Sequence, residues 1–372
     1  MTTTAPLMNQ ALGLAAQALY LSSPNPRVGC VIAASDGTIL GQGFTQQAGG
    51  PHAEVMALRD AQAAGADVRG ATAYVTLEPC AHQGRTGPCC DALIAAGVAK
   101  VVASLEDPNP LVAGQGFARL RAAGVAVEVG PGAAESRELN IGFFSRMARG
   151  LPWVRVKVAA SLDGTTALTN GASQWITSAE ARADGHSWRA RACAVMTGIG
   201  TVLADNPRLD VREVPTPRQP KSVVLDSRLE TPPDAHLFAA DRTCLIYAAG
   251  PLDPGFSTRK AALEARGATA VLLPGSAGQV DLHGALRDLA QRGVNELHVE
   301  AGYRLNGALL RQGLVDELLL YLAPRMLGPG RGMADLAPLE SLADGLALEF
   351  HSTQMIGPDL RVLARFQHPP WF

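Results

Sequence analysis

One histidine, one glutamate and two cysteines make up the densest group of reactive side chains in this 372-residue chain. Glu54 follows His52 by two residues, and Cys80 and Cys89 come further along. Imidazole nitrogen and thiolate sulfur are preferred zinc donors, and a catalytic zinc takes three protein ligands and leaves one position for water. We therefore predict that His52, Cys80 and Cys89 bind Zn²⁺ and that Glu54 stays outside the coordination shell.

The position of Glu54 suits a proton carrier. It lies in the same predicted helical turn as His52, close enough to reach a zinc-bound water, whose pKa zinc lowers to about 7. Glu54 would move a proton from this water to a ring nitrogen and then to a departing amine. A His-x-Glu motif followed by Pro-Cys-x-x-Cys is typical of zinc nucleobase deaminases.

The spacing departs from that pattern, because eight residues rather than two separate Cys80 from Cys89. This insert must loop out, and it carries His82 and Arg85, which suit a polar or phosphorylated substrate. The alternative is a closed structural zinc site with Cys90 or His82 as fourth ligand. Two arguments disfavour this closed site. Glu54 would have no chemical role there, and helical spacing points Cys90 away from Cys89.

The hydrophobic pattern indicates the elements that must position these residues. Helices are predicted over 8–21, 52–64, 89–96 and 116–123, and strands over 28–33, 38–44, 72–77, 101–105 and 125–129. Asp36 and Gly37 form a hairpin signal between the first two strands. Helices and strands alternate, so the fold class is α/β around a mostly parallel sheet. His52 and Cys89 would then open helices, and Cys80 would follow a strand.

A second α/β pattern follows a boundary that we place within residues 140–152. Its strands are predicted over 153–159, 194–197, 221–226, 244–248, 270–273, 296–300 and 317–322. No G-x-G-x-x-G motif follows a strand, so a Rossmann nucleotide site is not supported. Gly302 lies between the strand 296–300 and a helical run over 305–312, where a helix N-terminus can bind phosphate. The predicted domains are residues 1–148 and 149–372.

Composition narrows the class of partner. The formal net charge is −2 and the chain has no run of basic residues, which argues against a nucleic-acid partner. No apolar run is long enough to span a bilayer, and the N-terminus has no signal-peptide pattern, so we expect no membrane partner and a cytoplasmic location. Three of the six cysteines fall within residues 80–90, which favours a metal over disulfides. Cys30 and Cys90 are predicted to be core residues.

Several motifs resemble the bifunctional riboflavin biosynthesis proteins of the RibD family. In the first half they are residues 25–32 (NPRVGCVI), 52–54 (HAE) and 76–86 (TLEPCAHQGRT). In the second half they are residues 157–164 (KVAASLDG), 173–177 (SQWIT), 201–207 (TVLADNP) and 299–302 (VEAG). The resemblance implies an N-terminal cytidine-deaminase-like α/β/α sandwich and a C-terminal dihydrofolate-reductase-like α/β domain. It also implies a homo-oligomer, a dimer or larger.

The resemblance implies two reactions on small phosphorylated pyrimidines. The first is hydrolytic deamination of 2,5-diamino-6-(5-phosphoribosylamino)pyrimidin-4-one, with Zn²⁺ held by the three ligands named above and Glu54 as proton donor. The second is NADPH-dependent reduction of the ribosyl group of 5-amino-6-(5-phosphoribosylamino)uracil to the ribityl form. Lys157 and Asp205 are the candidate proton donors of the reductase site.

The resemblance also assigns site residues. The implied cofactor-binding residues are Ala159, Trp175, Thr177, Thr201, Asp205, Ser227, Gly302, Tyr303, Arg304, Leu305, Asn306, Gly307 and Ala308. The implied substrate-binding residues are Asn25, Arg27, His82, Lys157, Ser173, Arg189, Leu209, Arg212 and Glu300. Taken without the resemblance, Arg189 fits a solvated helix face, Trp175 a core residue and Asp205 the cap of a turn.

Two departures from the family pattern stand out. Residues 86–88 read Thr-Gly-Pro where relatives often have Thr-Pro-Pro, and residues 301–305 read Ala-Gly-Tyr-Arg-Leu where relatives often have Gly-Gly-Pro-Thr-Leu. Two rival functions remain open on the sequence alone. One is a cytidine or tRNA adenosine deaminase fused to a folate reductase, and the other is a zinc-stapled binding protein without turnover.

Overall fold

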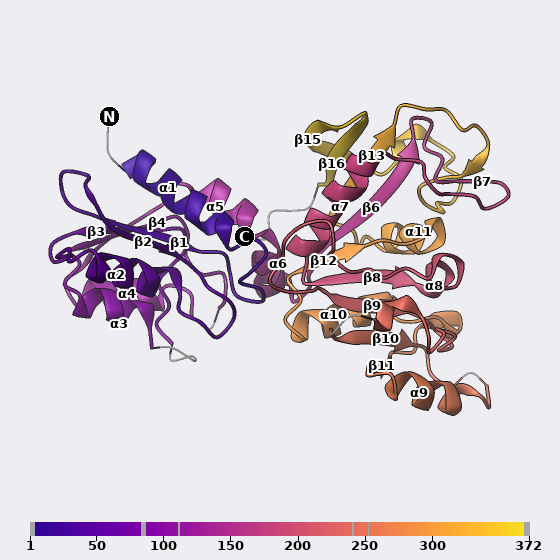
Figure 1. Ribbon diagram of the computed structural model, residues 1–372, viewed down its shortest axis with the longest axis horizontal. Helices are drawn as coiled ribbons and strands as arrows, with labels where there is room; N and C mark the ends of the chain where they lie inside the picture. The colour runs from indigo at the N-terminus through magenta and orange to yellow at the C-terminus, as the bar shows by residue number, and fades with distance from the viewer. Residues whose placement is uncertain (1–3, 83–86, 111, 240–241, 252, 368–372) are drawn as a thin grey trace. The chain divides into compact units, whose positions relative to one another are not determined.

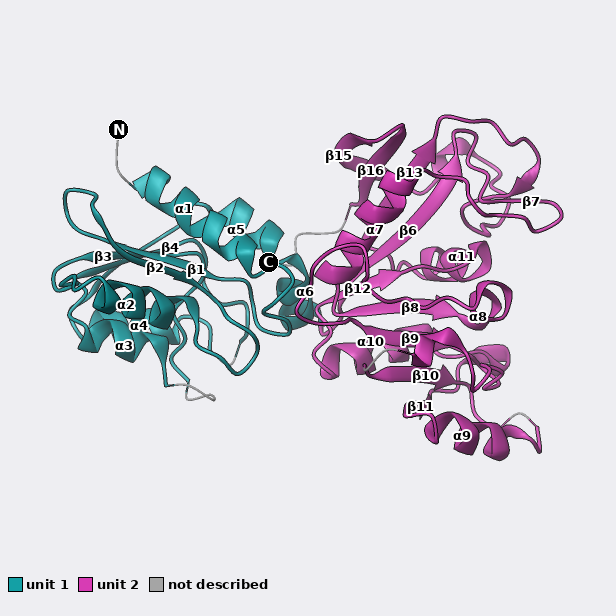
Figure 2. Ribbon diagram, viewed as in Figure 1, with its two compact units in different colours: residues 1–149, 372 teal, residues 150–371 magenta. Residues whose placement is uncertain are grey.

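The computed structural model describes residues 4–82, 87–110, 112–239, 242–251 and 253–367, so Arg85 lies outside the described residues. The chain divides into two compact units, residues 1–149 and residues 150–371, which Figure 2 colours teal and magenta. Within the stretch where the sequence analysis places the domain boundary, the structure has a helix, α6 (Ile141–Arg149), which ends unit 1.

Unit 1 is a three-layer α/β/α sandwich. Its sheet has the strand order β2-β1-β3-β4-β5, in which β1 runs antiparallel to both β2 and β3, while β3, β4 and β5 are parallel. The strands are β1 (Gly29–Ala33), β2 (Ile39–Phe44), β3 (Thr72–Val75), β4 (Lys100–Ala103) and β5 (Ala126–Val129). The predicted hairpin is therefore present, and half of the strand pairs, rather than most, are parallel.

Helices cover both faces of this sheet. Figure 1 shows α1 (Thr4–Gln17) and α5 (Ala133–Leu139) on one face and α2 (Ala53–Ala63), α3 (Cys89–Ala95) and α4 (Gln115–Ala122) on the other. Helix α2 lies close against β2, because a Cβ atom added to Gly43 would meet the Met56 Cβ at 2.5 Å. This contact fixes the helix that begins next to His52.

Unit 2 is built on a nine-stranded sheet with the order β11-β10-β9-β8-β12-β6-β13-β16-β15. The pairs from β11 to β13 are parallel, and only β13-β16 and β16-β15 are antiparallel. The strands are β6 (Trp153–Ser161), β8 (Ala194–Gly198), β9 (Lys221–Leu225), β10 (Cys244–Ala248), β11 (Ala268–Leu272), β12 (Glu296–Val299), β13 (Glu317–Ala323), β15 (Leu348–Ile356) and β16 (Asp359–Phe366). A separate short pair joins β7 (Ala167–Leu168) to β14 (Gly330–Arg331).

Five α-helices and three short 3₁₀ helices are described around this sheet. They are α7 (Ala179–Arg191), α8 (Ile199–Asp205), α9 (Phe256–Glu264), α10 (Leu282–Gln291), α11 (Tyr303–Arg311), η1 (His236–Phe238), η2 (Ser276–Gly278) and η3 (Leu342–Asp344). Alternate residues of β9 and β10 enter two different apolar clusters, one with α10 and α11 and the other with α8 and α9. The sheet is thus buried on both faces, as expected for parallel strands joined by helices.

The predicted fold class is confirmed, although four strands of unit 2 were missed. Every predicted strand is present with its ends shifted by at most two residues, whereas β7, β14, β15 and β16 were not predicted. All nine residues of β15 are exposed or half-exposed at the edge of the sheet, so this strand lacks the buried apolar pattern on which the prediction relied. Among the described residues, no helix combines the length and apolar character needed to cross a membrane.

Candidate active sites

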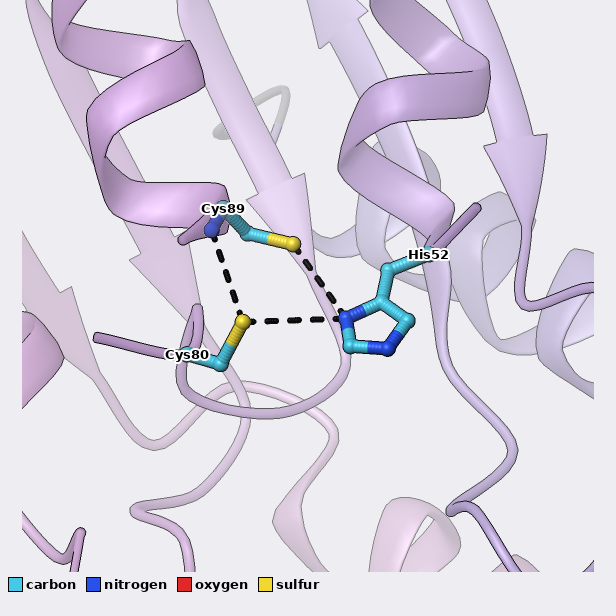
Figure 3. Close-up of side chains that lie close together, drawn as sticks. All are labelled: His52, Cys80 and Cys89. Atoms are coloured by element: carbon cyan, nitrogen blue, oxygen red, sulfur yellow. Dashed lines mark hydrogen bonds between the residues drawn. The ribbon is translucent and has the colours of Figure 1, made fainter. Parts of the chain in front are cut away.

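The three predicted zinc ligands of unit 1 converge at the N-terminal ends of two helices (Figure 3). His52 directly precedes α2, Cys89 is the first residue of α3, and Cys80 follows β3. The Nδ1 atom of His52 lies 3.3 Å from the Sγ atom of Cys89 and 3.6 Å from that of Cys80. The ligand atoms of all three residues fall within 4.8 Å of one another.

This geometry fits a tetrahedral zinc ion. With zinc at about 2.3 Å from sulfur and about 2.0 Å from nitrogen, neighbouring donors of a tetrahedron stand about 3.5 Å apart. The two nitrogen–sulfur separations match that value. Cys90, the fourth-ligand candidate of the closed-site alternative, is buried with its Sγ 3.8 Å from the Asp91 carboxylate. Among the described residues, the candidate metal-binding group therefore has three members, which suits an open catalytic site.

The electrostatics of the group favour a thiolate. The backbone N–H of Cys89 donates to the Sγ atom of Cys80 over 3.4 Å. Hydrogen bonds from the Cys89 thiol, the His52 ring and this N–H lower the pKa of Cys80 to about 4. Sharing a proton with Cys80 raises the pKa of the Cys89 thiol in turn. Without a cation the pair thus carries one negative charge, and a bound cation would favour both thiolates.

Glu54 lies beside this group in the first turn of α2, with only 3% of its surface exposed. Burial and the negative charge of Cys80 raise the pKa of Glu54 to about 7. A carboxyl group whose pKa is close to the working pH can both accept and donate a proton, which general acid–base catalysis requires. A bound cation would shift this pKa downward, toward the ionised form.

Glu78 is a further buried acid, two residues before Cys80, to which the sequence assigned no role. Its Oε1 accepts hydrogen bonds from the backbone N–H groups of Gly116 (2.8 Å) and Phe117 (3.2 Å). Its Oε2 accepts from those of Asp107 (3.1 Å) and Gly114 (3.0 Å). Glu78 thereby ties the strand end that carries Cys80 to the β4–α4 loop and to the start of α4.

Asp107 is the second acid that the sequence analysis missed. Burial raises its pKa to about 6, and the charges of Glu78, His82 and Cys80 act on it as well. The signal was available: Cys80 follows β3 and Asp107 follows β4, and these strands are parallel neighbours. Residues after the carboxyl ends of parallel strands meet at one edge of the sheet, where ligands commonly bind.

The three predicted substrate residues of unit 1 have different surroundings. His82 is exposed after Cys80, and Asn25 is half-buried in the loop before β1. Arg27 is buried, and its guanidinium donates to the carbonyl oxygen of Leu139 over 2.5 Å. Arg27 thus makes at least one contact that supports the fold, and its assignment to substrate stays a prediction.

In unit 2 the predicted residues gather after the carboxyl ends of three neighbouring parallel strands. Thr201 and Asp205 follow β8, Ser227 follows β9, and Glu300 and Gly302 follow β12. Ala159 lies in β6, and Ser173 and Thr177 lie in the segment before α7. Trp175 is not a core residue, because 64% of its surface is exposed and the guanidinium of Arg182 lies 4.5 Å from its ring centre.

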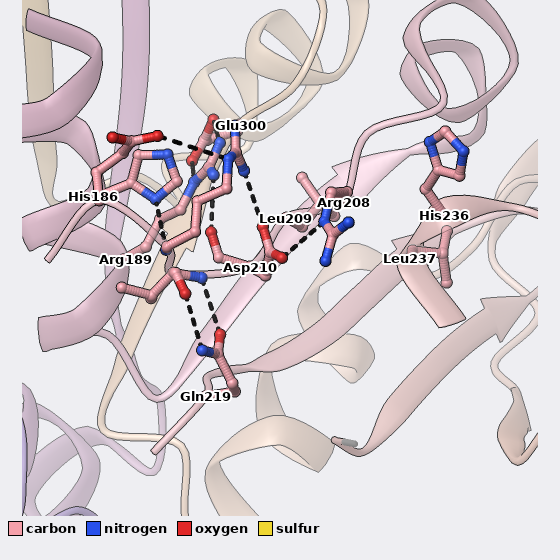
Figure 4. A network of polar contacts seen from close by, with 12 residues as sticks. His186, Arg189, Arg208, Leu209, Asp210, Gln219, His236, Leu237 and Glu300 are labelled. Carbon is pink, nitrogen blue, oxygen red and sulfur yellow. Dashed lines mark hydrogen bonds and ion pairs between the residues drawn. The ribbon is translucent and has the colours of Figure 1, made fainter. Parts of the chain in front are cut away.

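Arg189 and Glu300 form the central ion pair of this region (Figure 4). The Nη2 atom of Arg189 lies 2.8 Å from Oε2 of Glu300, and its Nε atom donates to Oε1. Arg189 is 15% exposed, so the interpretation as a solvated helix face is wrong. Despite burial, the charge of Arg189 and its hydrogen bonds hold the pKa of Glu300 well below its usual value.

Lys157 and two histidines surround this pair. Burial lowers the pKa of Lys157, while Glu300 opposes that shift. The Nε2 atom of His298 lies 3.4 Å from Oε1 of Glu300. Burial, together with the charges of Arg189 and Arg212, lowers the pKa of His186 to about 4. Its Nδ1 atom accepts the backbone N–H of Arg212 over 3.3 Å, which requires that nitrogen to be unprotonated.

The segment Asn206 to Arg212, which we call the 206–212 loop, contributes Leu209 and Arg212. Leu209 is 2% exposed and has a φ of 53°, a left-handed conformation that costs a non-glycine residue about 1–2 kcal/mol. Asp210 accepts one ion pair at 2.8 Å from Arg208 and another at 2.8 Å from Arg212. Two arginine side chains of the loop are thus ion-paired with the same carboxylate.

The seven predicted cofactor residues from Gly302 to Ala308 divide into two groups. Gly302 precedes α11, and Tyr303, Arg304 and Leu305 form its first turn, with Arg304 exposed. The side chain of Asn306 is instead buried and donates to the carbonyl oxygen of Met333 over 3.0 Å. A Cβ atom on Gly307 would meet the Asp335 carbonyl oxygen at 2.2 Å. Asn306 and Gly307 therefore pack against residues 333–335, and Ala308 lies in the same helix.

Comparisons with known proteins agree with this division of the chain. Residues 1–105 match the family model of the cytidine and deoxycytidylate deaminase zinc-binding region, and residues 152–362 match that of the RibD C-terminal domain. The riboflavin biosynthesis protein RibD of Escherichia coli (strain K12) is 46% identical over 358 residues, which cover 95% of this chain and 96% of that protein. The chain belongs to the RibD family. The RibD protein of Haemophilus influenzae is 41% identical, covering 95% of both chains.

Solved RibD structures share the whole architecture. Acinetobacter baumannii RibD superposes with a TM-score of 0.88 at 40% identity and covers 98% of this chain and 99% of its own. A Thermotoga maritima protein described as a diaminohydroxyphosphoribosylaminopyrimidine deaminase/5-amino-6-(5-phosphoribosylamino)uracil reductase superposes with a TM-score of 0.85 at 30% identity, with the same coverage. Membership of the RibD family confirms the sequence-based recognition, with Zn²⁺ and NADPH as its cofactors.

Proposed function

We propose that this chain is a bifunctional enzyme of riboflavin biosynthesis. It deaminates 2,5-diamino-6-(5-phosphoribosylamino)pyrimidin-4-one and then reduces the ribosyl group of 5-amino-6-(5-phosphoribosylamino)uracil with NADPH. The observation that carries this proposal is the His52, Cys80 and Cys89 group beside a buried Glu54, in a chain that matches RibD proteins over 95% of its length. We assign the deaminase to residues 1–148 and the reductase to residues 149–372.

His52, Cys80 and Cys89 would hold the zinc of the deaminase site. Zinc bound there supplies a water of lowered pKa and a Lewis acid. Glu54 would take one proton from the attacking water and place it on the pyrimidine ring nitrogen, and would then carry the second proton of that water to the departing amine. Asn25, Arg27 and His82 are the proposed substrate contacts, and the helix N-termini at residues 53 and 89 add a favourable field for anionic groups.

In the reductase site the protein positions two ligands for hydride transfer. Gly302 to Ala308 are proposed to contact NADPH together with Ala159, Trp175, Thr177, Thr201, Asp205 and Ser227. The substrate is proposed to bind Lys157, Ser173, Arg189, Leu209, Arg212 and Glu300. Arginine suits the phosphate because a planar guanidinium donates two parallel hydrogen bonds to it. The hydride itself comes from the cofactor.

One coupled experiment tests both activities. The purified full chain is analysed for zinc, and ammonia release and NADPH oxidation are followed with the diaminopyrimidine phosphate as substrate. We expect one bound zinc per chain and NADPH oxidation that follows ammonia release. Cytidine should not be deaminated. A chain that releases ammonia from cytidine but not from the pyrimidine phosphate would overturn the proposed substrate.

Glu54→Gln separates the two sites. A glutamine keeps the shape of the side chain but cannot carry the proton, so we expect the deaminase rate to fall by about 10²- to 10⁴-fold. Bound zinc and NADPH oxidation with pre-deaminated substrate should persist. A variant that keeps the full deaminase rate would contradict the role of Glu54. A wild-type chain that binds its ligands without turnover would indicate a binding protein.

The finer statements on assembly and location are proposals as well. We propose a homo-oligomer, a dimer or larger, formed by unit 2 through β15, which is an edge strand with 79% of Phe350 and 60% of Met355 exposed. Exposed edge strands readily pair with a second chain. Light scattering of the wild type and of Phe350→Glu tests this: a monomeric wild type would overturn it. We also propose a cytoplasmic location, which fractionation of cells tests.

A further inference from the structure

The backbone of the 206–212 loop is held by side chains from several other segments of unit 2 (Figure 4). His186 accepts the N–H of Arg212, and Arg189 donates to the carbonyl oxygen of Asp210 over 2.9 Å. Gln219 makes a pair of bonds with Val211, accepting its N–H over 2.8 Å and donating to its carbonyl over 2.9 Å. Separate side-chain hydrogen bonds to individual backbone groups therefore hold the conformation of this loop.

Arg242 holds the remaining part of this loop. Its Nη1 atom donates to the carbonyl oxygen of Leu209 over 2.7 Å, and its Nη2 atom donates to that of Arg208. Nη2 also lies 3.5 Å from the carbonyl oxygen of Leu237 in η1, which is fully buried. One guanidinium thus joins two consecutive loop carbonyls to the apolar cluster beneath β9 and β10.

The bonding of Arg242 differs from that of the three arginines that pair with acids at this site. Arg189 pairs with Glu300, and Arg208 and Arg212 both pair with Asp210. Within the part of the chain that the structure describes, the hydrogen-bond partners of Arg242 are main-chain carbonyl groups. Its positive charge therefore adds to the potential around the loop, since an arginine remains protonated even when burial lowers its pKa.

The bonds of Arg242 coincide with the strained point of the loop. Leu209 has the left-handed φ of 53°, and such a conformation persists only where its surroundings over-determine it. The two loop carbonyl groups that Arg242 binds belong to Arg208 and Leu209. Directly beside them, Arg208 and Arg212 extend from Asp210 with about half of each side chain exposed (54% and 50%).

We propose that Arg242 is a positioning residue of the reductase site. By binding the carbonyl groups of Arg208 and Leu209, it keeps the 206–212 loop in the conformation in which Arg208 and Arg212 together present N–H groups to the phosphate monoester of the substrate. The inference rests on the proposed function, because the phosphate monoester belongs to the substrate of the proposed reductase. Arg208 becomes a second phosphate contact beside Arg212, and Asp210 sets the spacing of the two guanidinium groups.

The test is steady-state kinetics on full-length Arg242→Met and Arg242→Lys. Arg259→Met, which breaks an ion pair with Asp253 at α9, is the matched control. For Arg242→Met we expect the KM for the phosphorylated pyrimidine to rise about tenfold with kcat within about twofold, because the lost interactions act on binding. The KM of Arg242→Lys should lie between those of the wild type and Arg242→Met, since an ammonium group lacks the planar arrangement of N–H donors of a guanidinium. The KM for NADPH and the deaminase rate should stay at wild-type values.

Two further measurements separate positioning from general support of the fold. Inorganic phosphate should inhibit the wild-type reductase competitively, with an inhibition constant that rises about tenfold in Arg242→Met, as the KM does. The same pyrimidine without its phosphate should be reduced equally well by the wild type and by both variants. This last comparison would not hold if the substitution merely loosened unit 2.

The outcomes are distinct. Unchanged KM and phosphate inhibition in both Arg242 variants would overturn the inference, as would a wild type that phosphate does not inhibit. A parallel loss of kcat, NADPH binding and turnover of the phosphate-free substrate would also overturn it, in favour of a purely structural role. A wild type that fails to oxidise NADPH with the phosphorylated pyrimidine would instead refute the proposed function itself.

Discussion

The two candidate sites of this protein are organised in opposite ways. In unit 1, two thiols and an imidazole stand within 4.8 Å of one another as three converging donors. In unit 2, the charged side chains are already paired with one another, Arg189 with Glu300 and both Arg208 and Arg212 with Asp210. The first arrangement is completed by a cation, whereas the second is complete before a ligand arrives.

This difference determines how each site should respond to the substitution of one of its residues. A site that depends on a metal fails at once when a ligand is lost, because the remaining donors bind the ion much more weakly. A site that is held by a network of ion pairs and backbone contacts should lose function and stability together, in steps that follow the burial of the removed group. The following predictions test that contrast, from the largest effect to the smallest.

The largest effect is expected for Cys89→Ser. Loss of one zinc ligand should lower the deaminase rate by at least about 10³-fold, because the metal contributes several kcal/mol to the transition state. Zinc content and ammonia release measure this, while NADPH oxidation with pre-deaminated substrate should not change. Cys90→Ser, at the neighbouring buried cysteine, is the control and should keep its zinc. Full deaminase activity in Cys89→Ser would remove Cys89 from the ligand set.

In unit 2 we expect Arg189→Met to combine two losses. The substitution leaves the buried carboxylate of Glu300 without its main partner, which should lower the free energy of unfolding of unit 2 by about 3 kcal/mol. The KM for the phosphorylated pyrimidine should rise about 100-fold, which corresponds to about 2.7 kcal/mol. Urea unfolding and the two activity assays measure both effects on one sample.

The exposed Arg287 of α10 provides the control for that substitution, and Arg287→Met should behave as the wild type. Deaminase activity should also be unchanged in Arg189→Met. If instead only the KM changed and unfolding did not, the ion pair would not be part of the framework, and the contrast between the two sites would fail.

Glu78→Gln should have an intermediate effect. Each carboxylate oxygen accepts two backbone N–H groups, so the amide NH₂ of glutamine would face two donors. We expect the free energy of unfolding of unit 1 to fall by about 2 kcal/mol and the deaminase rate about tenfold, with zinc retained. Chemical unfolding, ammonia release and zinc analysis measure these. Glu128→Gln, at an exposed ion pair with Lys100, is the control. A deaminase rate equal to that of the wild type would deny Glu78 a positioning role.

The smallest effect concerns pH. The pKa of His186 is lowered to about 4 from an ordinary value of 6.5, so the unfolded chain binds a proton in this window that the folded chain does not. The free energy of unfolding should therefore decrease as the pH falls from 6.5 toward 4, by about 1 kcal/mol after allowance for solvent screening. His186→Gln should remove this part of the pH dependence, and His283→Gln should not. Urea unfolding at several pH values decides between them.

The sequence predicted unit 1 more completely than unit 2 for a physical reason. Residue types restrict zinc chemistry strongly, so His52, Cys80 and Cys89 could be recognised before their positions were known. Glu78 was missed, because a carboxylate that accepts backbone N–H groups leaves no mark in residue type or spacing. Asp107 was missed because its nearness to Cys80 depends on which strands are neighbours. Only the parallel pairing of β3 with β4 brings Asp107 to Cys80.

In unit 2 the site is made of contacts between segments far apart in sequence. Arg242 and Leu209 are ordinary residue types at their positions, and neither the left-handed φ of Leu209 nor the bond between them follows from a local pattern. The Arg189 ion pair likewise required the register of β12 beside β8 to place Glu300. The exposed β15 could not be predicted, since burial periodicity was the signal used for strands.

The way in which Glu78 is bound also bears on how this protein can drift in evolution. Because its donors are main-chain amides, the bonds to the carboxylate involve no side-chain atom of residues 107, 114 and 117. Glycine is still favoured at two of the donor positions, since a Cβ atom at 116 would meet the Pro79 carbonyl oxygen at 2.0 Å and Gly114 has a left-handed φ of 74°. The four bonds to Glu78 therefore depend on one acidic side chain and on two positions without a side chain, 114 and 116.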